Sequence, residues 1–218
     1  MLIILFLGFN VFVWHKSRNI LPQLEITENV PSEISIKSFS LGDEQFYYRI
    51  LAWQLQFMGD SFGRVSPLKY YDYVKIKNWF YLLDKLDNKT NYSPVIATYY
   101  YGVTPKKEDL IHIIEYLEKH SEVDLTKKWW WMYQASYLAF HEMKYHSKGI
   151  ELAKKVAQTK GTLPLWARQL PAFYHEKIGE KDIAYFIIKD ILDNEKNIPQ
   201  SELNFMEYYI KDRLKLFE

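Results

Sequence analysis

Hydrophobic residues along most of this chain recur three and four positions apart, the spacing that places side chains on one face of an α-helix. The pattern is clearest over residues 72–86, after Pro105, and over residues 180–193. The stripes are Ile76, Trp79, Phe80 and Leu83, then Leu110, Ile113, Ile114 and Leu117, then Ala184, Ile187, Ile188 and Ile191. No segment alternates strictly as a half-buried strand does. The pattern therefore predicts an all-α protein.

Further helices are predicted on both sides of these segments. A first helix after Ser40 would bury a stripe formed by Phe46, Ile50, Trp53 and Phe57. Short segments follow, with helices over 127–142, 147–159 and 163–178. Because Pro171 lies inside the last of these, that segment is either a bent helix or two short ones. A final helix, 200–217, has apolar residues on one side and charges opposite, which is typical of a terminal cap.

Two copies of one helical hairpin can be recognised in the second half of the chain. The pairs His141-Glu142 and His175-Glu176 lie 34 positions apart, and Ile150 and Ile183 lie 33 apart. A period near 34 residues made of two helices is typical of an α-solenoid, in which each hairpin buries its apolar face against its neighbours. We therefore expect an α-α superhelix of antiparallel helix pairs.

The amino-terminal segment differs from the rest. Residues Leu2 to Trp14 carry no charge and would span about 20 Å as a helix, against about 30 Å of bilayer hydrocarbon. His15-Lys16-Ser17-Arg18 follows, without a small-residue cleavage site. Residues 1–18 are expected to be an uncleaved membrane anchor, a cleaved signal or a buried core helix, in that order of preference. Residues 19–38 are expected to be a linker and residues 39–218 a helical-repeat domain.

Charge and cysteine content narrow the possible partners. The chain has 28 Lys and Arg against 27 Asp and Glu, so it lacks the basic excess that phosphate contacts require, and nucleic acid is not expected as a partner. It has no cysteine, which excludes disulfides, thiol catalysis and cysteine-ligated metal.

No motif points to catalysis or to a cofactor. His141, Glu142 and His146 place two histidines five positions apart, whereas a metalloprotease helix needs them four apart. The loop between Gly59 and Gly63 lacks the lysine and Ser or Thr of a phosphate-binding loop. We therefore expect no catalytic residue, no metal and no cofactor, and a hydrolase of unrecognised type is only a remote alternative.

Aromatic residues supply the candidates for a binding surface. The chain has 18 Tyr, 13 Phe and 7 Trp, 17% of its residues. Large side chains can fill the seams between hairpins, or they can line a recognition surface. Because consecutive helical residues point about 100° apart, at most two of the tryptophans at 129–131 can be buried. The candidate protein-binding residues are Tyr100, Trp130, Trp131, Trp166, Arg168 and, in the glycine-flanked loop, Arg64.

The hairpin period, the apolar seams and the prolines near repeat ends, Pro164 and Pro199, resemble the tetratricopeptide-repeat superfamily over residues 72–198. The strings SLGDEQFYYRILAWQLQFMGDSFGR and LPLWARQLPAF are similar to an uncharacterised family of bacterial membrane-anchored proteins of this kind. That resemblance implies an inner-membrane location, a single-pass anchor and a helical-repeat body, and it implies no activity.

Together these features predict a membrane-tethered protein-binding scaffold or assembly factor that is not an enzyme. Its partner would be a protein or peptide of a membrane-associated complex, held on a concave surface of the solenoid. The alternative is a constitutive structural subunit of a larger complex, with a broad exposed apolar patch instead of a confined groove. The side of the membrane stays open.

Overall fold

The computed structural model describes residues 2–18, 25–60, 65–195 and 197–215. This part of the chain is helical and contains no strand, so the all-α prediction is confirmed. The helices are α1 (Leu2–Ser17), α2 (Glu33–Ser40), α3 (Glu44–Gln56), α4 (Tyr73–Leu86), α5 (Tyr92–Tyr99), α6 (Leu110–Glu122), α7 (Leu125–Tyr137), α8 (His146–Ala157), α9 (Leu165–Lys177), α10 (Lys181–Asn194) and α11 (Gln200–Tyr208). The 3-10 turns are Leu68–Tyr70, Tyr101–Val103 and Lys107–Asp109, and the π-helical turns are Leu138–Glu142 and Tyr209–Leu214.

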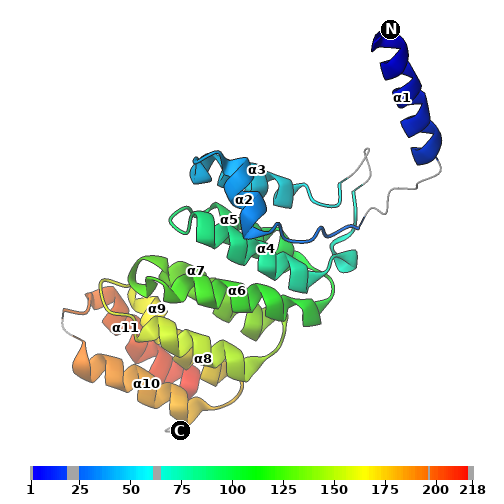
Figure 1. The fold of residues 1–218 in the computed structure, drawn as a ribbon. Helices are drawn as coiled ribbons and strands as arrows, with labels where there is room; N and C mark the ends of the chain where they lie inside the picture. Colours follow the sequence, from blue (N-terminus) through cyan, green and yellow to red (C-terminus); the bar gives the residue numbers. More distant parts are fainter. Residues whose placement is uncertain (1, 19–24, 61–64, 196, 216–218) are drawn as a thin grey trace.

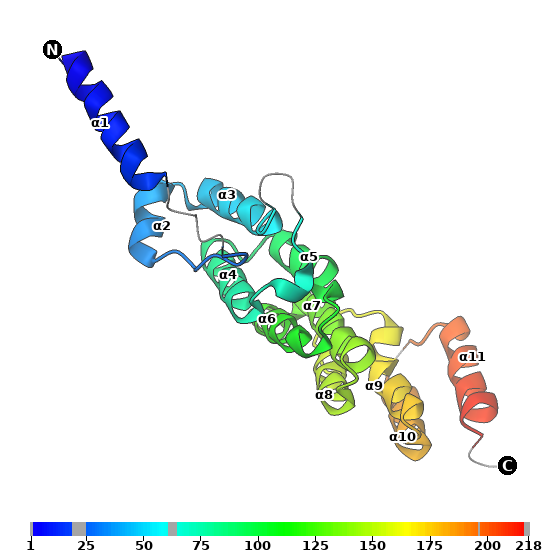
Figure 2. The same ribbon diagram turned by 90° about the vertical axis from the view of Figure 1, so that its right-hand side faces the viewer.

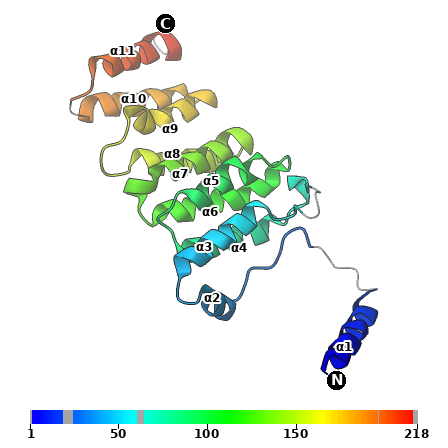
Figure 3. The ribbon, with the colours of Figure 1, turned by 90° about the horizontal axis from the view of Figure 1, so that it is seen from above.

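Helices that follow one another in the chain also pack on one another. α6 packs on α7, α7 on α8, α8 on α9 and α9 on α10. Figures 1 and 3 show the helices in chain order, from α2 and α3 at one end of the body to α11 at the other. From α6 to α10 each helix thereby buries apolar side chains against its neighbours, and such packing is the main source of stability for helices of this length.

The main core lies in the first two thirds of the body and contains two of the predicted stripes. Ile76, Trp79, Phe80 and Leu83 of α4 are buried, as are Leu110, Ile113, Ile114 and Leu117 of α6. A separate core lies at the carboxyl end, around Ala184, Ile188, Met206 and Tyr209. Both predicted stripes in the main core are therefore confirmed.

The prediction for α3 is wrong. Phe46, Ile50, Trp53 and Phe57, the expected core stripe, are between 42% and 62% exposed. The buried face of α3 is instead formed by Tyr48, Leu51, Ala52 and Leu55. Both faces are apolar, but only the second combines a small residue with a tyrosine whose hydroxyl contacts Ser93 Oγ at 2.9 Å and Thr90 Oγ1 at 2.7 Å. Those polar contacts allow Tyr48 to be buried without leaving its hydroxyl unpaired.

Residues 25–31 form a strap across α4. The indole nitrogen of Trp79 donates to the carbonyl of Glu28 at 2.9 Å, and the backbone N–H of Asp72 donates to Thr27 Oγ1 at 2.9 Å. Lys75 pairs with Glu25 at 2.7 Å. The strap lies inside the predicted linker 19–38, and α2 (Glu33–Ser40) begins inside it and ends two residues beyond it.

The predicted single-pass anchor, and with it the inner-membrane location, is wrong. Among the described residues no helix combines the length and the apolar character needed to cross a bilayer. α1 has 16 residues, about 24 Å of helix against about 30 Å of hydrocarbon. Figures 1 and 3 show α1 standing apart from the other helices.

The hairpin of α7 and α8 is closed by an unusually close helix contact. α7 continues into a π-helical turn over Leu138–Glu142, and Gly149 of α8 lies directly against Phe140 of this turn. A β-carbon at Gly149 would be 2.5 Å from the Phe140 β-carbon and 2.9 Å from its backbone nitrogen. The Ser136 hydroxyl donates to the Gly149 carbonyl at 3.0 Å, which fixes the same contact from the α7 side.

Two other sequence expectations concern the carboxyl-terminal helices. Pro171 lies inside a single helix, α9, which resolves the choice between one helix and two. At the end of the chain Met206 and Leu214 are buried, as the predicted cap requires, and charged residues such as Glu207 and Lys211 are exposed. The last two residues of the predicted helix, 216 and 217, lie outside the described residues.

Candidate binding groove

A groove of about 800 Å³ lies between α8, α9 and α10. Its apolar wall and floor come from Ala157, Pro171, Ile183, Phe186, Ile187 and Ile191. Its polar rim is formed by Lys154 and Gln158 of α8, Arg168 of α9, and Asp190, Asn194 and Glu195 on the α10 side. Large, mostly apolar concavities with a few polar groups at the edge are the usual form of binding sites.

The groove exists because α10 is apolar on two sides. Ala184, Ile188 and Ile191 point into the carboxyl-terminal core. Ile183, Phe186 and Ile187 form a second stripe that faces the groove, and the side chain of Phe186 is 66% exposed. A phenylalanine left in water forgoes about 2 kcal/mol of hydrophobic free energy, so this wall would gain stability from an occupant.

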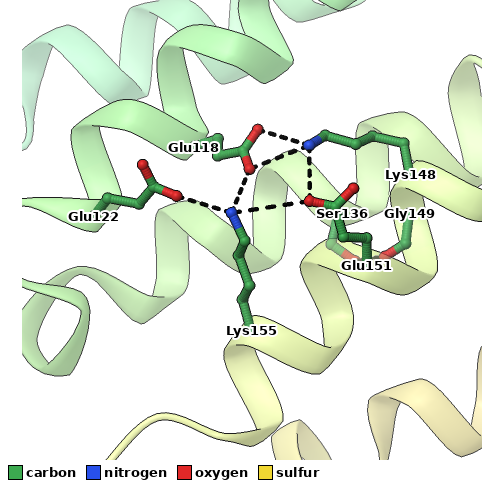
Figure 4. Close-up of polar contacts among 7 residues, drawn as sticks. All are labelled: Glu118, Glu122, Ser136, Lys148, Gly149, Glu151 and Lys155. Atoms are coloured by element: carbon green, nitrogen blue, oxygen red, sulfur yellow. Dashed lines mark hydrogen bonds and ion pairs between the residues drawn. The ribbon is translucent and has the colours of Figure 1, made fainter.

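The contact between a helix and the second helix after it becomes less direct from α4 to α10. α4 packs directly on α6. α6 and α8 are connected by long charged side chains (Figure 4). α8 and α10 are separated by the groove. The groove therefore exists because the side chains of α8 and α10 do not fill the space between these two helices.

The ionic contact between α6 and α8 centres on Glu118, whose side chain is largely buried. Glu118 pairs with Lys155 at 2.6 Å and with Lys148 at 3.0 Å. Lys155 also reaches Glu122 at 2.8 Å, and Lys148 reaches Glu151 at 3.0 Å (Figure 4). Burial by itself would raise the pKa of Glu118, but the hydrogen bonds from Lys155 and Lys148 outweigh it and hold that pKa below its usual value.

This lowered pKa predicts an acid-dependent contribution of Glu118 to stability. Its pKa is lower in the folded chain than in the unfolded one, so the contribution is complete above the unfolded value of about 4.3 and is lost as pH falls through the folded value. The free energy of unfolding of the natural chain should exceed that of Glu118→Gln by the largest margin at neutral pH. The margin should shrink below about pH 4.

Urea unfolding of both chains between pH 3 and pH 7 measures this margin. Glu151→Gln is the matched control, because Glu151 belongs to the same cluster but its side chain is 52% exposed and its pair should contribute little. A margin for Glu118→Gln that does not change with pH would contradict the prediction.

Arg168 is held at the groove by three oxygen atoms. Its guanidinium lies 3.1 Å from the carboxylate of Glu195 and donates to the carbonyl oxygens of Gly161 at 3.2 Å and Ala157 at 3.5 Å. Arg168 and Glu195 also line a second cavity of about 380 Å³, next to Leu165 and Ile198. The Arg168–Glu195 ion pair therefore lines both the groove and the second cavity.

The candidate residues from the sequence lie in different places, and of the five that the structure describes only Arg168 lines the groove. Trp130 and Trp166 both contact the ring of Tyr133, at 5.2 Å and 5.1 Å between ring centroids. Trp131 is buried in the main core, and its indole nitrogen donates to Asn91 Oδ1 at 3.1 Å. Tyr100 packs against the ring of Tyr101, and Arg64 lies outside the described residues.

The tryptophan triplet follows its sequence prediction. Trp131 is buried, Trp129 is half-buried beside Trp166, and Trp130 is exposed. The groove residues Ile183 and Phe186, in contrast, were missed. The signal was present, because α10 has three apolar residues beyond those that one buried stripe needs.

Two buried histidines each have one ring nitrogen in contact with a carboxylate, whereas the other ring nitrogen, Nε2, is buried without a hydrogen-bond partner. His120 Nδ1 contacts Asp84 Oδ2 at 2.7 Å, and His175 Nδ1 contacts Glu180 Oε2 at 2.5 Å. No set of three His, Cys, Asp or Glu side chains in the described part of the chain is arranged to hold a metal ion. The side chains of His120 and His175 are buried, and neither residue lines the groove.

The chain matches no protein-family model, no curated protein and no solved structure.

Proposed function

We propose that this protein is a protein-binding scaffold, built as an α-solenoid of the tetratricopeptide-like kind, and that the groove between α8 and α10 is its binding site. The exposed apolar stripe of α10 carries this proposal, since Ile183 and Phe186 form one wall of a groove large enough for several side chains. The order in which α6 to α10 pack along the chain supports the solenoid interpretation. A confined groove favours a scaffold over a constitutive structural subunit, which would present a broad patch.

The charges at the rim define the chemistry of the partner. Lys154 lies exposed on the α8 side, whereas Asp190 lies on the α10 side and accepts a hydrogen bond from Asn194 at 2.7 Å. The partner is therefore an amphipathic helix with apolar residues three, four and seven positions apart, acidic residues along one edge and basic residues along the other. The apolar side chains would enter the groove and the charged edges would face the rim.

A displayed library of amphipathic helical peptides, panned on the full chain, tests the proposal directly. Peptides enriched on the natural chain should bind Phe186→Glu about a hundredfold more weakly, because a carboxylate would have to be buried against their apolar face. Fluorescence anisotropy with the enriched peptides measures the dissociation constants. Val103→Glu is the matched control, since Val103 is equally exposed but lies far from the groove, in the turn after α5.

Enriched peptides should also follow the pattern of apolar and charged positions given above. If the peptides bind Phe186→Glu and the natural chain with equal affinity, the groove is not the binding site. If panning enriches no helical peptide on the folded chain, the scaffold proposal itself fails.

A further inference from the structure

The two ends of the stacked helices differ in polarity. At the carboxyl end, the exposed side of α11 carries Ser201, Asn204 and Glu207 together with one aromatic residue, Tyr208, a mostly polar surface that suits the last layer of a stack. At the amino end, the outer side of α3 exposes the apolar stripe of Phe46, Ile50, Trp53 and Phe57. We call these four residues the α3 stripe. The amino-terminal end of the stack therefore lacks the polar outer surface that its carboxyl end has.

The same chain carries a second apolar surface without a cover. α1 is apolar on all sides, and its large side chains are exposed, namely Leu5, Phe6, Leu7, Phe9, Val11, Phe12, Val13 and Trp14. Its amide side chain, Asn10, donates back to the carbonyl of Phe6 at 3.1 Å, which further reduces its polarity. α1 and the α3 stripe are thus two apolar surfaces that each need a partner.

The dimensions of the two surfaces fit each other. α1 is about 24 Å long, and the α3 stripe extends over about 16 Å of helix. Seven residues separate Ser17 from Glu25, the start of the strap, and the eight extended Cα–Cα steps between these two residues reach about 28 Å. The strap lies next to α3, because Gln54 donates to the Glu28 carboxylate at 2.7 Å. Gln54 follows Trp53 directly, so the strap, which begins at Glu25, is attached to the same helix as the α3 stripe.

We propose that α1 packs on the α3 stripe of its own molecule as a removable cover for the amino-terminal end of the stack. A short tether gives α1 an effective local concentration in the millimolar range, which favours this partner over a second copy at low protein concentration. With α1 in place, Trp53 and Phe57 are withheld from other proteins. When α1 is displaced, as it stands in Figure 2, the α3 stripe is open.

Thiol labelling of a single engineered cysteine tests this contact. The natural chain has no cysteine, so Ile50→Cys places one reactive thiol in the α3 stripe. In the full chain this thiol should react about tenfold more slowly with a maleimide than in the same chain carrying Phe9→Asp and Phe12→Asp, which makes α1 polar. Phe186→Cys in the groove, tested with and without the same changes in α1, is the control whose rate should not change.

Labelling at several protein concentrations distinguishes a contact within one molecule from a contact between two copies. Protection by a cover within one molecule stays constant over a hundredfold range of protein concentration, as does the monomeric mass measured by light scattering. Protection that increases with concentration would mean that α1 covers a second copy, and it would overturn the proposal. Equal labelling rates with and without the changes in α1 would overturn it too, as would protection that occurs only after phosphatidylcholine vesicles are added.

Ile50→Cys should not disturb the fold, because Ile50 is exposed. The changes in α1 should not disturb it either, because α1 stands apart from the body. Circular dichroism of each variant checks this. Trp53→Cys provides a second position in the α3 stripe, and it must show the same protection if the contact extends along the helix.

Discussion

Replacing Gly149 by alanine is expected to lower the free energy of unfolding by about 3 kcal/mol, the upper range for forcing an extra carbon into a packed contact. The added β-carbon would lie 2.5 Å from the Phe140 β-carbon and 2.9 Å from Phe140 backbone atoms. Backbone atoms cannot rotate away, so α8 must shift relative to the π-helical turn. The shift would also strain the hydrogen bond from Ser136 to the Gly149 carbonyl. Urea unfolding followed by tryptophan fluorescence measures the change.

Gly102→Ala is the matched control for this prediction. A β-carbon at Gly102 would meet the Ala97 carbonyl oxygen at 3.4 Å and the Leu138 side chain at 3.5 Å, which are ordinary van der Waals distances. Its effect should stay within about 0.5 kcal/mol. If the two variants have the same stability, α7 and α8 do not approach each other as closely as described here.

Replacing Asp84 by alanine is expected to lower the free energy of unfolding by about 3 kcal/mol, since hydrogen bonds to a charged group contribute about 1.5 kcal/mol or more each. Asp84 Oδ1 accepts from the Tyr116 hydroxyl at 3.0 Å, and Asp84 Oδ2 lies 2.7 Å from His120 Nδ1. Tyr116 and His120 are both buried, so neither can find water as a substitute partner. Burial, followed by the nearby Asp84 charge, raises the pKa of Tyr116 far above its usual value, so this hydroxyl stays protonated and donates.

Urea unfolding of three further variants shows which contacts of Asp84 account for the lost free energy of unfolding. Asp84→Asn keeps an acceptor and should destabilise less than Asp84→Ala. Tyr116→Phe removes one hydrogen bond and should cost about 1 kcal/mol. Asp193→Ala, at an exposed carboxylate on α10, is the control and should be close to neutral. Equal stabilities of Asp84→Ala and Asp193→Ala would contradict the prediction.

The periodicity of apolar residues was sufficient to place most helices, and for α4 and α6 it also identified the buried face. In these helices the apolar stripe that contains Trp79 or Leu117 is the buried one, and the opposite side is mostly polar. α3 and α10 each have two apolar stripes, and periodicity cannot choose between them. In α3 the choice depends on Tyr48, whose hydroxyl contacts residues 42 and 45 positions away. Pairings over such distances in sequence leave no periodic signal.

The groove could be predicted only in part, for a related reason. Arg168 was a candidate because of its residue type, but the groove results from a gap between α8 and α10, and gaps depend on how far apart whole helices lie. The aromatic residues Trp130 and Trp131 were attractive candidates for the same compositional reason. Trp131 instead fills the core and donates to Asn91, which shows that residue type alone does not separate a packing residue from a binding one.

The helices α8 and α10 on either side of the groove contribute to different core clusters, which are linked through α9, and this has a mechanical consequence. Val156 of α8 belongs to the main core, whereas Ile191 of α10 belongs to the carboxyl-terminal one. Any helix lying in the groove would contact α8 and α10 at once and would restrain the motion of one relative to the other. The carboxyl-terminal helices would then bend less with respect to the rest of the molecule. Occupancy of the groove would thereby reduce the flexibility of the chain as far away as α11.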